Sequence, residues 1–163
     1  LLMKTSDPCK IQKVRTTQEV IMPLINFGSI MGFAEELEKQ DEAFYAAAAA
    51  NSAFAEHKGL FEQFLKDARK NIKNVQRVRR ENVTEMILEK INDFTRAPYC
   101  EEINPADAKD ISEILESARC LENRALRYYT DAAVKMKALS EVARELKRIG
   151  KKHTAHLKKL DAL

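Results

Sequence analysis

Two glutamates are the residues best placed to do chemistry, because both fall on the predicted buried face of a helix. Glu122 lies among apolar residues that recur at helical spacing between residues 111 and 136. Glu38 lies in a similar stripe 84 residues earlier, and a tyrosine follows each glutamate seven residues later, at Tyr45 and Tyr129. A buried carboxylate is costly unless it is paired with another group or coordinates a metal ion. The sequence therefore predicts two helices of similar design that carry a carboxylate into the core.

His153 and His156 form the second candidate for chemistry. They lie three residues apart, so a helix would present both imidazoles on one face. Two histidines and a carboxylate together suit Fe(II), Zn(II) or Mn(II). We therefore expect a three-ligand metal site made of Glu122 and the two histidines, with Glu38 or Asp41 as a fourth ligand.

A metal-free polar network is the alternative interpretation of the same residues. In this network Glu38 and Glu122 would be hydrogen-bonded to the two tyrosines, to Asn71 and to the histidine pair, with no ion present. Buried polar groups can satisfy one another in this way. The residue types are compatible with both interpretations.

The composition predicts a soluble, all-helical, single-domain protein. The chain has 163 residues, of which 45% are hydrophobic and 33% charged, with only four glycines and four prolines. No stretch has the pattern of a membrane span or a signal peptide. Cys9, Cys100 and Cys120 are irregularly spaced and form no CxxC motif, so we expect reduced thiols and a cytoplasmic protein.

The apolar stripes place four helices in residues 30–163, after an N-terminal arm with a short helix in residues 1–29. We expect the helices at about residues 30–50, 60–91 with a bend near 81–82, 107–136 and 139–160. The first two and the last two form similar halves, offset by 84 or 85 residues, and residues 92–107 form a long connection between them. A connection of this length permits a crossover from one end of a helix bundle to the other.

Over about residues 30–160 the chain resembles a rubrerythrin-type member of the ferritin-like superfamily. In that family the first and third helices carry Glu-x-x-Ala-x-x-x-Tyr, the second and fourth carry Glu-x-x-His, and two irons lie between them. Glu122, Ala125 and Tyr129 match the third-helix motif in full. Glu38 matches the first-helix ligand, but Asp41 replaces the alanine and adds a carboxylate toward the core.

The resemblance is only partial at the other four ligand positions, where one ligand is retained, one is exchanged and two are missing. In the second helix the Glu and His positions fall on Ala68 and Asn71, and neither can replace the ligand that is lost. In the fourth helix His153 stands where the bridging Glu is expected, and His156 matches the family's histidine. Asp67 and Glu62 lie near the vacancy in sequence, but their facing on the helix argues against either of them replacing the lost carboxylate.

The resemblance implies a ferritin-like up-down four-helix bundle with a long crossover connection between helices 2 and 3. It also implies a metal-binding protein with an incomplete di-iron site, in iron handling or the oxidative-stress response, and a homodimer by analogy. The cofactor would be iron, or a single Fe, Zn or Mn ion. An enzyme of this type would oxidise Fe(II) with dioxygen or peroxide, and the missing second-helix ligands argue against that activity. The alternative function is a non-catalytic helical scaffold or partner-binding protein that has lost its metal.

Lysines and arginines are frequent on the second and fourth predicted helices. We interpret them as a solvated outer face and do not expect a nucleic-acid partner, because the formal net charge is only +3. Binding to an acidic partner or to nucleic acid, with a steep loss of affinity on adding salt, is the weaker alternative.

Overall fold

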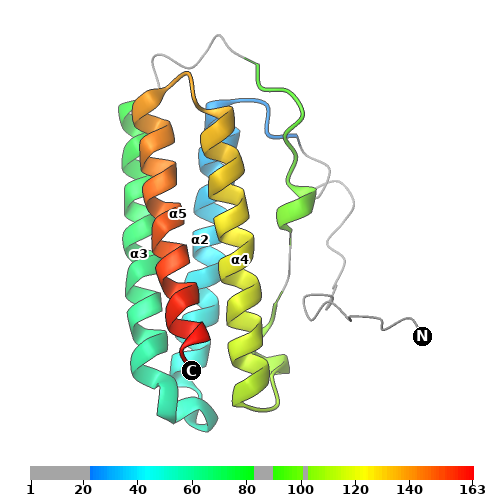
Figure 1. The fold of residues 1–163 in the computed structure, drawn as a ribbon, viewed down its shortest axis with the longest axis vertical. Helices are drawn as coiled ribbons and strands as arrows, with labels where there is room; N and C mark the ends of the chain where they lie inside the picture. Colours follow the sequence, from blue (N-terminus) through cyan, green and yellow to red (C-terminus); the bar gives the residue numbers. More distant parts are fainter. Residues whose placement is uncertain (1–22, 83–89, 101–102) are drawn as a thin grey trace, which may run out of the picture.

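The computed structural model describes residues 23–82, 90–100 and 103–163, and most of these residues are helical (Figure 1). The long helices are α2 (Phe27–Ala50), α3 (Lys58–Glu81), α4 (Ile111–Lys135) and α5 (Ser140–Asp161). Short 3-10 helices are η1 (Ser52–His57), η3 (Ala97–Tyr99) and η4 (Pro105–Asp107). The described residues contain no strand, only an isolated bridge between Pro23 and Thr95. The prediction of an all-α protein is confirmed.

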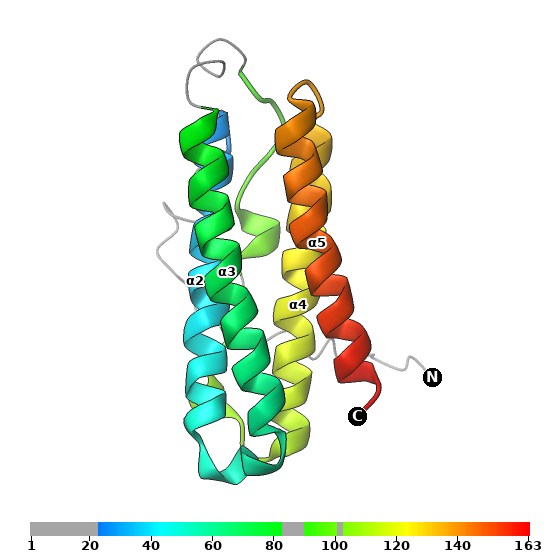
Figure 2. The same ribbon diagram turned by 90° about the vertical axis from the view of Figure 1, so that its left-hand side faces the viewer.

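The four long helices lie alongside one another as two antiparallel pairs, α2 with α3 and α4 with α5 (Figures 1 and 2). Helices α3 and α4 point in the same direction, so the end of α3 and the start of α4 lie at opposite ends of the molecule (Figure 2). Residues 90–100 pack against this body: Leu24 N donates to Phe94 O at 2.8 Å, and Tyr99 packs edge-on against Phe33 and Tyr128.

Most predicted helix boundaries are close to the observed ones, with two corrections. Helix α2 begins at Phe27, earlier than predicted, because Asn26 and Ser29 form a capping box in which Ser29 N donates to Asn26 Oδ1 at 2.8 Å. Helix α3 ends at Glu81, and residues 90–91 are not helical, so the predicted end near residue 91 is wrong. The predicted arm and short helix of residues 1–22 lie outside the described residues.

Two apolar clusters fill the core, one toward each end of the molecule. The larger combines the start of α2 and α5 with the end of α3 and α4, and the smaller combines the opposite halves of the same helices. Between the two clusters each long helix contributes at least one buried polar residue. The apolar packing therefore holds a polar layer halfway along the four helices.

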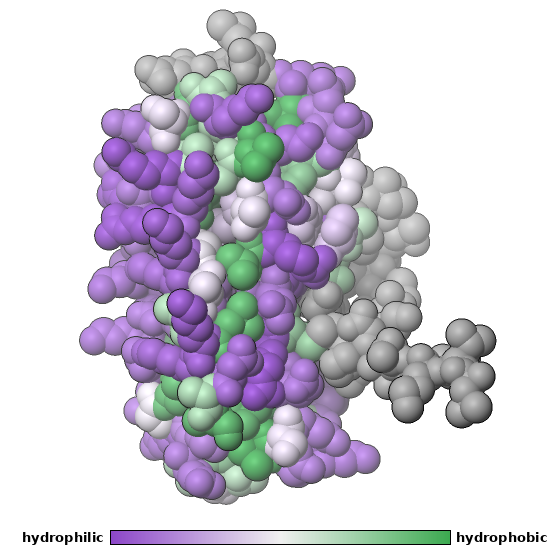
Figure 3. Space-filling model, viewed as in Figure 1, coloured by the Kyte–Doolittle hydropathy of each residue, from purple (hydrophilic) through white to green (hydrophobic). Residues whose placement is uncertain are grey.

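The surface is predominantly hydrophilic on the face seen in Figure 3, with hydrophobic residues in a strip along its length. Among the described residues, the large hydrophobic side chains that are well exposed are Ile25, Val134 and Leu163. No helix within the described ranges is long and apolar enough to span a membrane.

Cys120 departs from the prediction of reduced thiols. It is buried in α4 and is disulfide-bonded, so the expectation of a reduced thiol is wrong at this position.

Candidate metal centre

All four long helices contribute side chains to the buried polar layer. Its members are Glu38 and Asp41 from α2, Asn71 from α3, Glu122 and Arg124 from α4, and His153 and His156 from α5. The layer includes every residue that the sequence predicts as a metal ligand. Helical periodicity explains this agreement, because it decides which positions of each helix face the core.

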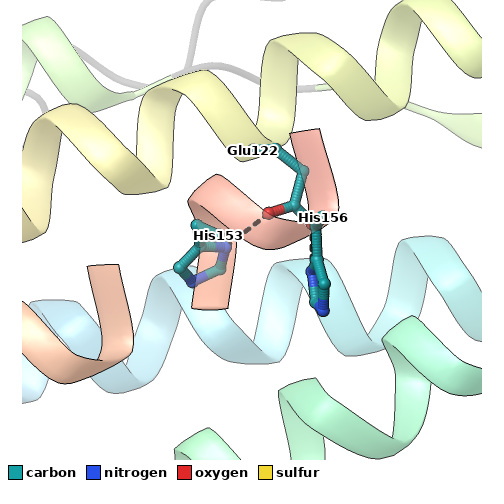
Figure 4. Close-up of side chains that lie close together, drawn as sticks. All are labelled: Glu122, His153 and His156. Carbon is teal, nitrogen blue, oxygen red and sulfur yellow. Dashed lines mark hydrogen bonds and ion pairs between the residues drawn. The ribbon is translucent and has the colours of Figure 1, made fainter. Parts of the chain in front are cut away.

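Glu122 contacts both histidines through their Nδ1 atoms (Figure 4). Glu122 Oε2 lies 2.5 Å from Nδ1 of His153, and Glu122 Oε1 lies 3.0 Å from Nδ1 of His156. One ligand atom from each of the three residues can be chosen so that all lie within 4.8 Å of one another. This spread is compatible with metal–ligand distances of about 2.0–2.2 Å.

The second nitrogen of each imidazole faces another carboxylate. Nε2 of His153 lies 2.8 Å from Glu38 Oε1, and Nε2 of His156 lies 2.7 Å from Asp67 Oδ2. Histidines that bind metals commonly use one nitrogen as ligand while a carboxylate holds the N–H of the other. Both histidines therefore have the hydrogen-bonding pattern of a metal ligand.

Asp67 reaches the layer through a contact that the sequence analysis did not predict. Its facing on α3 argued against replacing the lost carboxylate, and its partly exposed carboxylate instead meets His156 at the edge of the layer. The imidazole of His156 is held in that direction by stacking on Phe64, with ring centroids 3.9 Å apart. Facing on α3 alone could not reveal the contact, because His156 reaches across from α5.

The two repeated tyrosines cross between the halves of the chain. Tyr45 donates to Glu122 Oε1 at 2.6 Å, and Tyr129 donates to Glu38 Oε1 at 2.8 Å. Each tyrosine thus binds the glutamate of the opposite half rather than its own. Burial raises the pKa of both hydroxyls, so they remain donors at neutral pH.

Asp41 forms a buried ion pair that the sequence analysis missed. Arg124 Nη2 lies 3.0 Å from Asp41 Oδ1, Arg124 Nη1 donates to Gln40 Oε1 at 2.7 Å, and Arg124 is fully buried. The sequence did contain a signal for the burial of Arg124, because this residue lies on the same helix face as Leu121, Ala125 and Tyr128, which are all buried.

Asn71 approaches the layer from α3 without completing its hydrogen bonds. Its Nδ2 donates to Glu38 Oε2 at 3.3 Å. Within the described part of the chain, Asn71 Oδ1 and Asp41 Oδ2 are buried oxygens that lack a hydrogen-bond partner. The layer thus retains acceptor capacity on the α2–α3 side.

Burial and pairing act in opposite directions on the acid–base groups of the layer. Burial alone would raise the pKa of Glu122, but His153 and His156 outweigh it and lower that pKa to about 2. Burial alone would lower the pKa of His153, but Glu122 and Glu38 outweigh it and raise that pKa well above 6.5. Burial raises the pKa of Asp41 more than the attraction of Arg124 lowers it. Without a metal, the two carboxylates therefore favour the protonated form of His153.

A second group of possible ligands lies beside the first. One ligand atom each from Glu38, Asp41 and His153 can also be chosen within 4.8 Å of one another. His153 belongs to both groups, with Nδ1 toward Glu122 and Nε2 toward Glu38. The five predicted ligand residues therefore form two adjacent groups that share one imidazole.

Comparisons of the chain with protein-family models, curated proteins and solved structures found no match.

Proposed function

We propose that the protein binds one divalent metal ion, Fe(II), Zn(II) or Mn(II), between α4 and α5. The observation that carries this proposal is the orientation of the two histidines. Each turns Nδ1 toward Glu122 and has its Nε2 held by a separate carboxylate, from Glu38 or Asp67. This pattern fixes the direction of a metal-binding lone pair on each ring.

The roles of the individual residues follow from these contacts. The carboxylate of Glu122 and the Nδ1 atoms of His153 and His156 would hold the ion. Glu38 and Asp67 orient the imidazoles and increase their basicity, while the hydroxyl of Tyr45 orients Glu122. Three protein ligands leave a coordination position for water or a substrate, where the ion supplies Lewis-acid chemistry or, for iron, redox chemistry.

In the wider proposal the chain is a rubrerythrin-like bundle of the ferritin-like superfamily with an incomplete di-iron site. Support comes from the matching helix motifs, from the parallel directions of α3 and α4, and from the convergence of the predicted ligands. A role in iron handling or the oxidative-stress response rests on the resemblance. Ala68 and Asn71 on α3 provide no bridging carboxylate, which argues against ordinary di-iron oxidase activity.

A metal-free scaffold is the second candidate function, and the hydrogen bonds of the layer favour it. Both nitrogens of each histidine and both oxygens of Glu122 already have protein partners. The imidazolium of His153 supplies a positive charge between Glu38 and Glu122 without any ion. In this candidate function the layer has only a structural role, in holding the four helices together, and partners bind to the outer surface of the bundle.

Thermal melting of chelator-treated protein tests the proposal. At a free metal concentration of about 100 times Kd, the folded state gains about 2.7 kcal/mol, which raises Tm by roughly 5–10 °C. We expect this rise with at least one of Fe(II) (under anaerobic conditions), Zn(II) and Mn(II). Glu122→Gln should abolish it, because the amide cannot replace the charged ligand.

The matched control is Glu62→Gln, which changes an exposed glutamate on α3 and should leave the metal-induced rise intact. Unchanged melting of the natural protein with all three metals would contradict the proposal and support the scaffold.

A further inference from the structure

Two buried charged residues that differ between the repeated halves are paired with each other. At the offset of 84 residues, Asp41 corresponds to Ala125 and Arg124 corresponds to Gln40. The first half thus has an additional carboxylate, and the second half has an additional guanidinium. Their side chains meet at 3.0 Å, and both are at most 1% exposed.

Arg124 brings a permanent positive charge to the second group of possible metal ligands. That group consists of Glu38, Asp41 and His153. Arg124 is held beside it by Asp41 and by Gln40, which accepts a hydrogen bond from Nη1 at 2.7 Å. A guanidinium does not lose its proton in proteins, so this charge persists at every pH at which the protein folds.

We propose that Arg124 takes the place of a second metal ion and so limits this centre to one. The guanidinium pairs with the carboxylate of Asp41, and it repels a cation that approaches this group of ligands. This inference concerns the same centre as the proposed function and rests on it for the count of one ion. Without Arg124, an ion could bind Glu38 and Asp41 of that group. Asp41 Oδ2 lacks a hydrogen-bond partner in the part of the chain that is described, and so does Asn71 Oδ1, on the amide that donates to Glu38.

The variant Arg124→Gln tests the inference, because it installs the residue found at the equivalent position of the first half. Bound metal is counted by elemental analysis after equilibrium dialysis against Mn(II) or, anaerobically, Fe(II). We expect one ion per chain in the natural protein and two in the variant. Without metal, the variant should melt at a lower temperature than the natural protein, because Asp41 has lost its cation. Added metal should raise the melting temperature of the variant more than that of the natural protein.

Two further variants separate the charge from other effects. Arg124→Lys keeps a positive charge and should stay at one ion per chain. The double variant Asp41→Ala with Arg124→Gln removes both charges and restores the repeat, so it should fold and also stay at one ion. If Arg124→Gln does not fold alone, it is refolded in excess Mn(II): recovery with two ions supports the inference, and failure to recover overturns it.

The outcomes distinguish the inference from the proposed function. Two ions in the natural protein, or one ion in folded Arg124→Gln, would overturn the inference and leave the proposed metal site standing. No ion in the natural protein together with one in Arg124→Gln would overturn the proposed function and support the role of Arg124.

Discussion

At the scale of single residues, a proton and a metal ion compete for His153. In the absence of metal the imidazolium binds Glu122 and Glu38 at 2.5 and 2.8 Å. A metal at Nδ1 must displace a proton, so ion binding is expected to release protons and to strengthen as the pH rises. The same imidazole is thus central to both candidate functions.

The pH dependence of stability in the metal-free protein tests the pairing of Glu122. The pKa of this carboxyl is about 2 in the folded protein and near 4.5 as its ordinary value, so its stabilising contribution is complete above about pH 4.5. That contribution is lost as the pH falls from 4.5 toward 2. Urea denaturation should therefore show that Glu122→Gln destabilises most above pH 4.5 and progressively less toward pH 2.

The contribution of His153 to stability changes with pH in the opposite direction, because the pKa of this imidazole is raised above 6.5. Its stabilising contribution is complete below pH 6.5 and is lost as the pH rises through the raised pKa.

The control for the Glu122 experiment is the exposed Glu62→Gln, which should change the free energy of unfolding only slightly at every pH. A pH-independent effect of Glu122→Gln would contradict the ionic pairing.

The tyrosine hydroxyls provide a second test at this scale. Tyr45→Phe and Tyr129→Phe each remove a donor to a buried carboxylate and should cost about 1.5–3 kcal/mol in the free energy of unfolding. Tyr128→Phe is the matched control: it removes a bond to the neutral carbonyl of Ile30 and should cost about 0.5–1.5 kcal/mol. Equal losses in all three variants, measured by urea denaturation, would indicate that the carboxylates are not charged.

At the scale of elements, the close packing of α4 and α5 positions the histidines. A Cβ on Gly150 would lie 3.4 Å from Cβ of Tyr129 and 3.9 Å from Cδ1 of Leu126. His153 follows Gly150 by about one helical turn, so the spacing of the two helices at this point determines how far its ring lies from Glu122.

Gly150→Leu tests this dependence. The additional side chain must separate α4 and α5, and we expect a loss of about 1–3 kcal/mol in stability together with a smaller metal-induced rise in Tm. Gly59→Leu is the matched control, because no atom lies within 4 Å of its added Cβ. The control should stay within about 0.5 kcal/mol of the natural protein. A Gly150→Leu variant with full metal binding would show that the spacing of α4 and α5 is not decisive.

At the scale of the whole molecule, the polar layer joins the two helix pairs. Tyr45 to Glu122, Tyr129 to Glu38, and Arg124 to Asp41 are all contacts between α2 and α4, and His153 links α5 to α2. Hydrogen bonds and ion pairs of this kind require a specific geometry. The layer therefore specifies how one pair sits against the other.

The homodimer and the cytoplasmic location both remain predictions at this scale. Sedimentation would distinguish a chain of 18.6 kDa from a particle of about twice that mass.

The sequence by itself determined the helical class and the membership of most of the core. Glu38, Asp41, Glu122, His153 and His156 were predicted to face inward and are all buried, because a period of 3.6 residues decides which side of a helix is covered. The start of α2 shows the limit of this information. Apolar periodicity placed it near residue 30, whereas the capping box of Asn26 and Ser29 begins the helix at Phe27.

Only the tertiary structure decided which of these inward groups touch. The crossing of Tyr45 and Tyr129 to opposite halves, the reach of His156 to Asp67 and the pairing of Arg124 with Asp41 are contacts between helices. Periodicity gives the direction of a side chain from its own helix axis, but the distance and rotation between two helices depend on all the packed side chains between them. For this reason the inward-facing residues and the set of polar partners of Glu38 and Glu122 could be predicted from the sequence, whereas which partner contacts which glutamate could not.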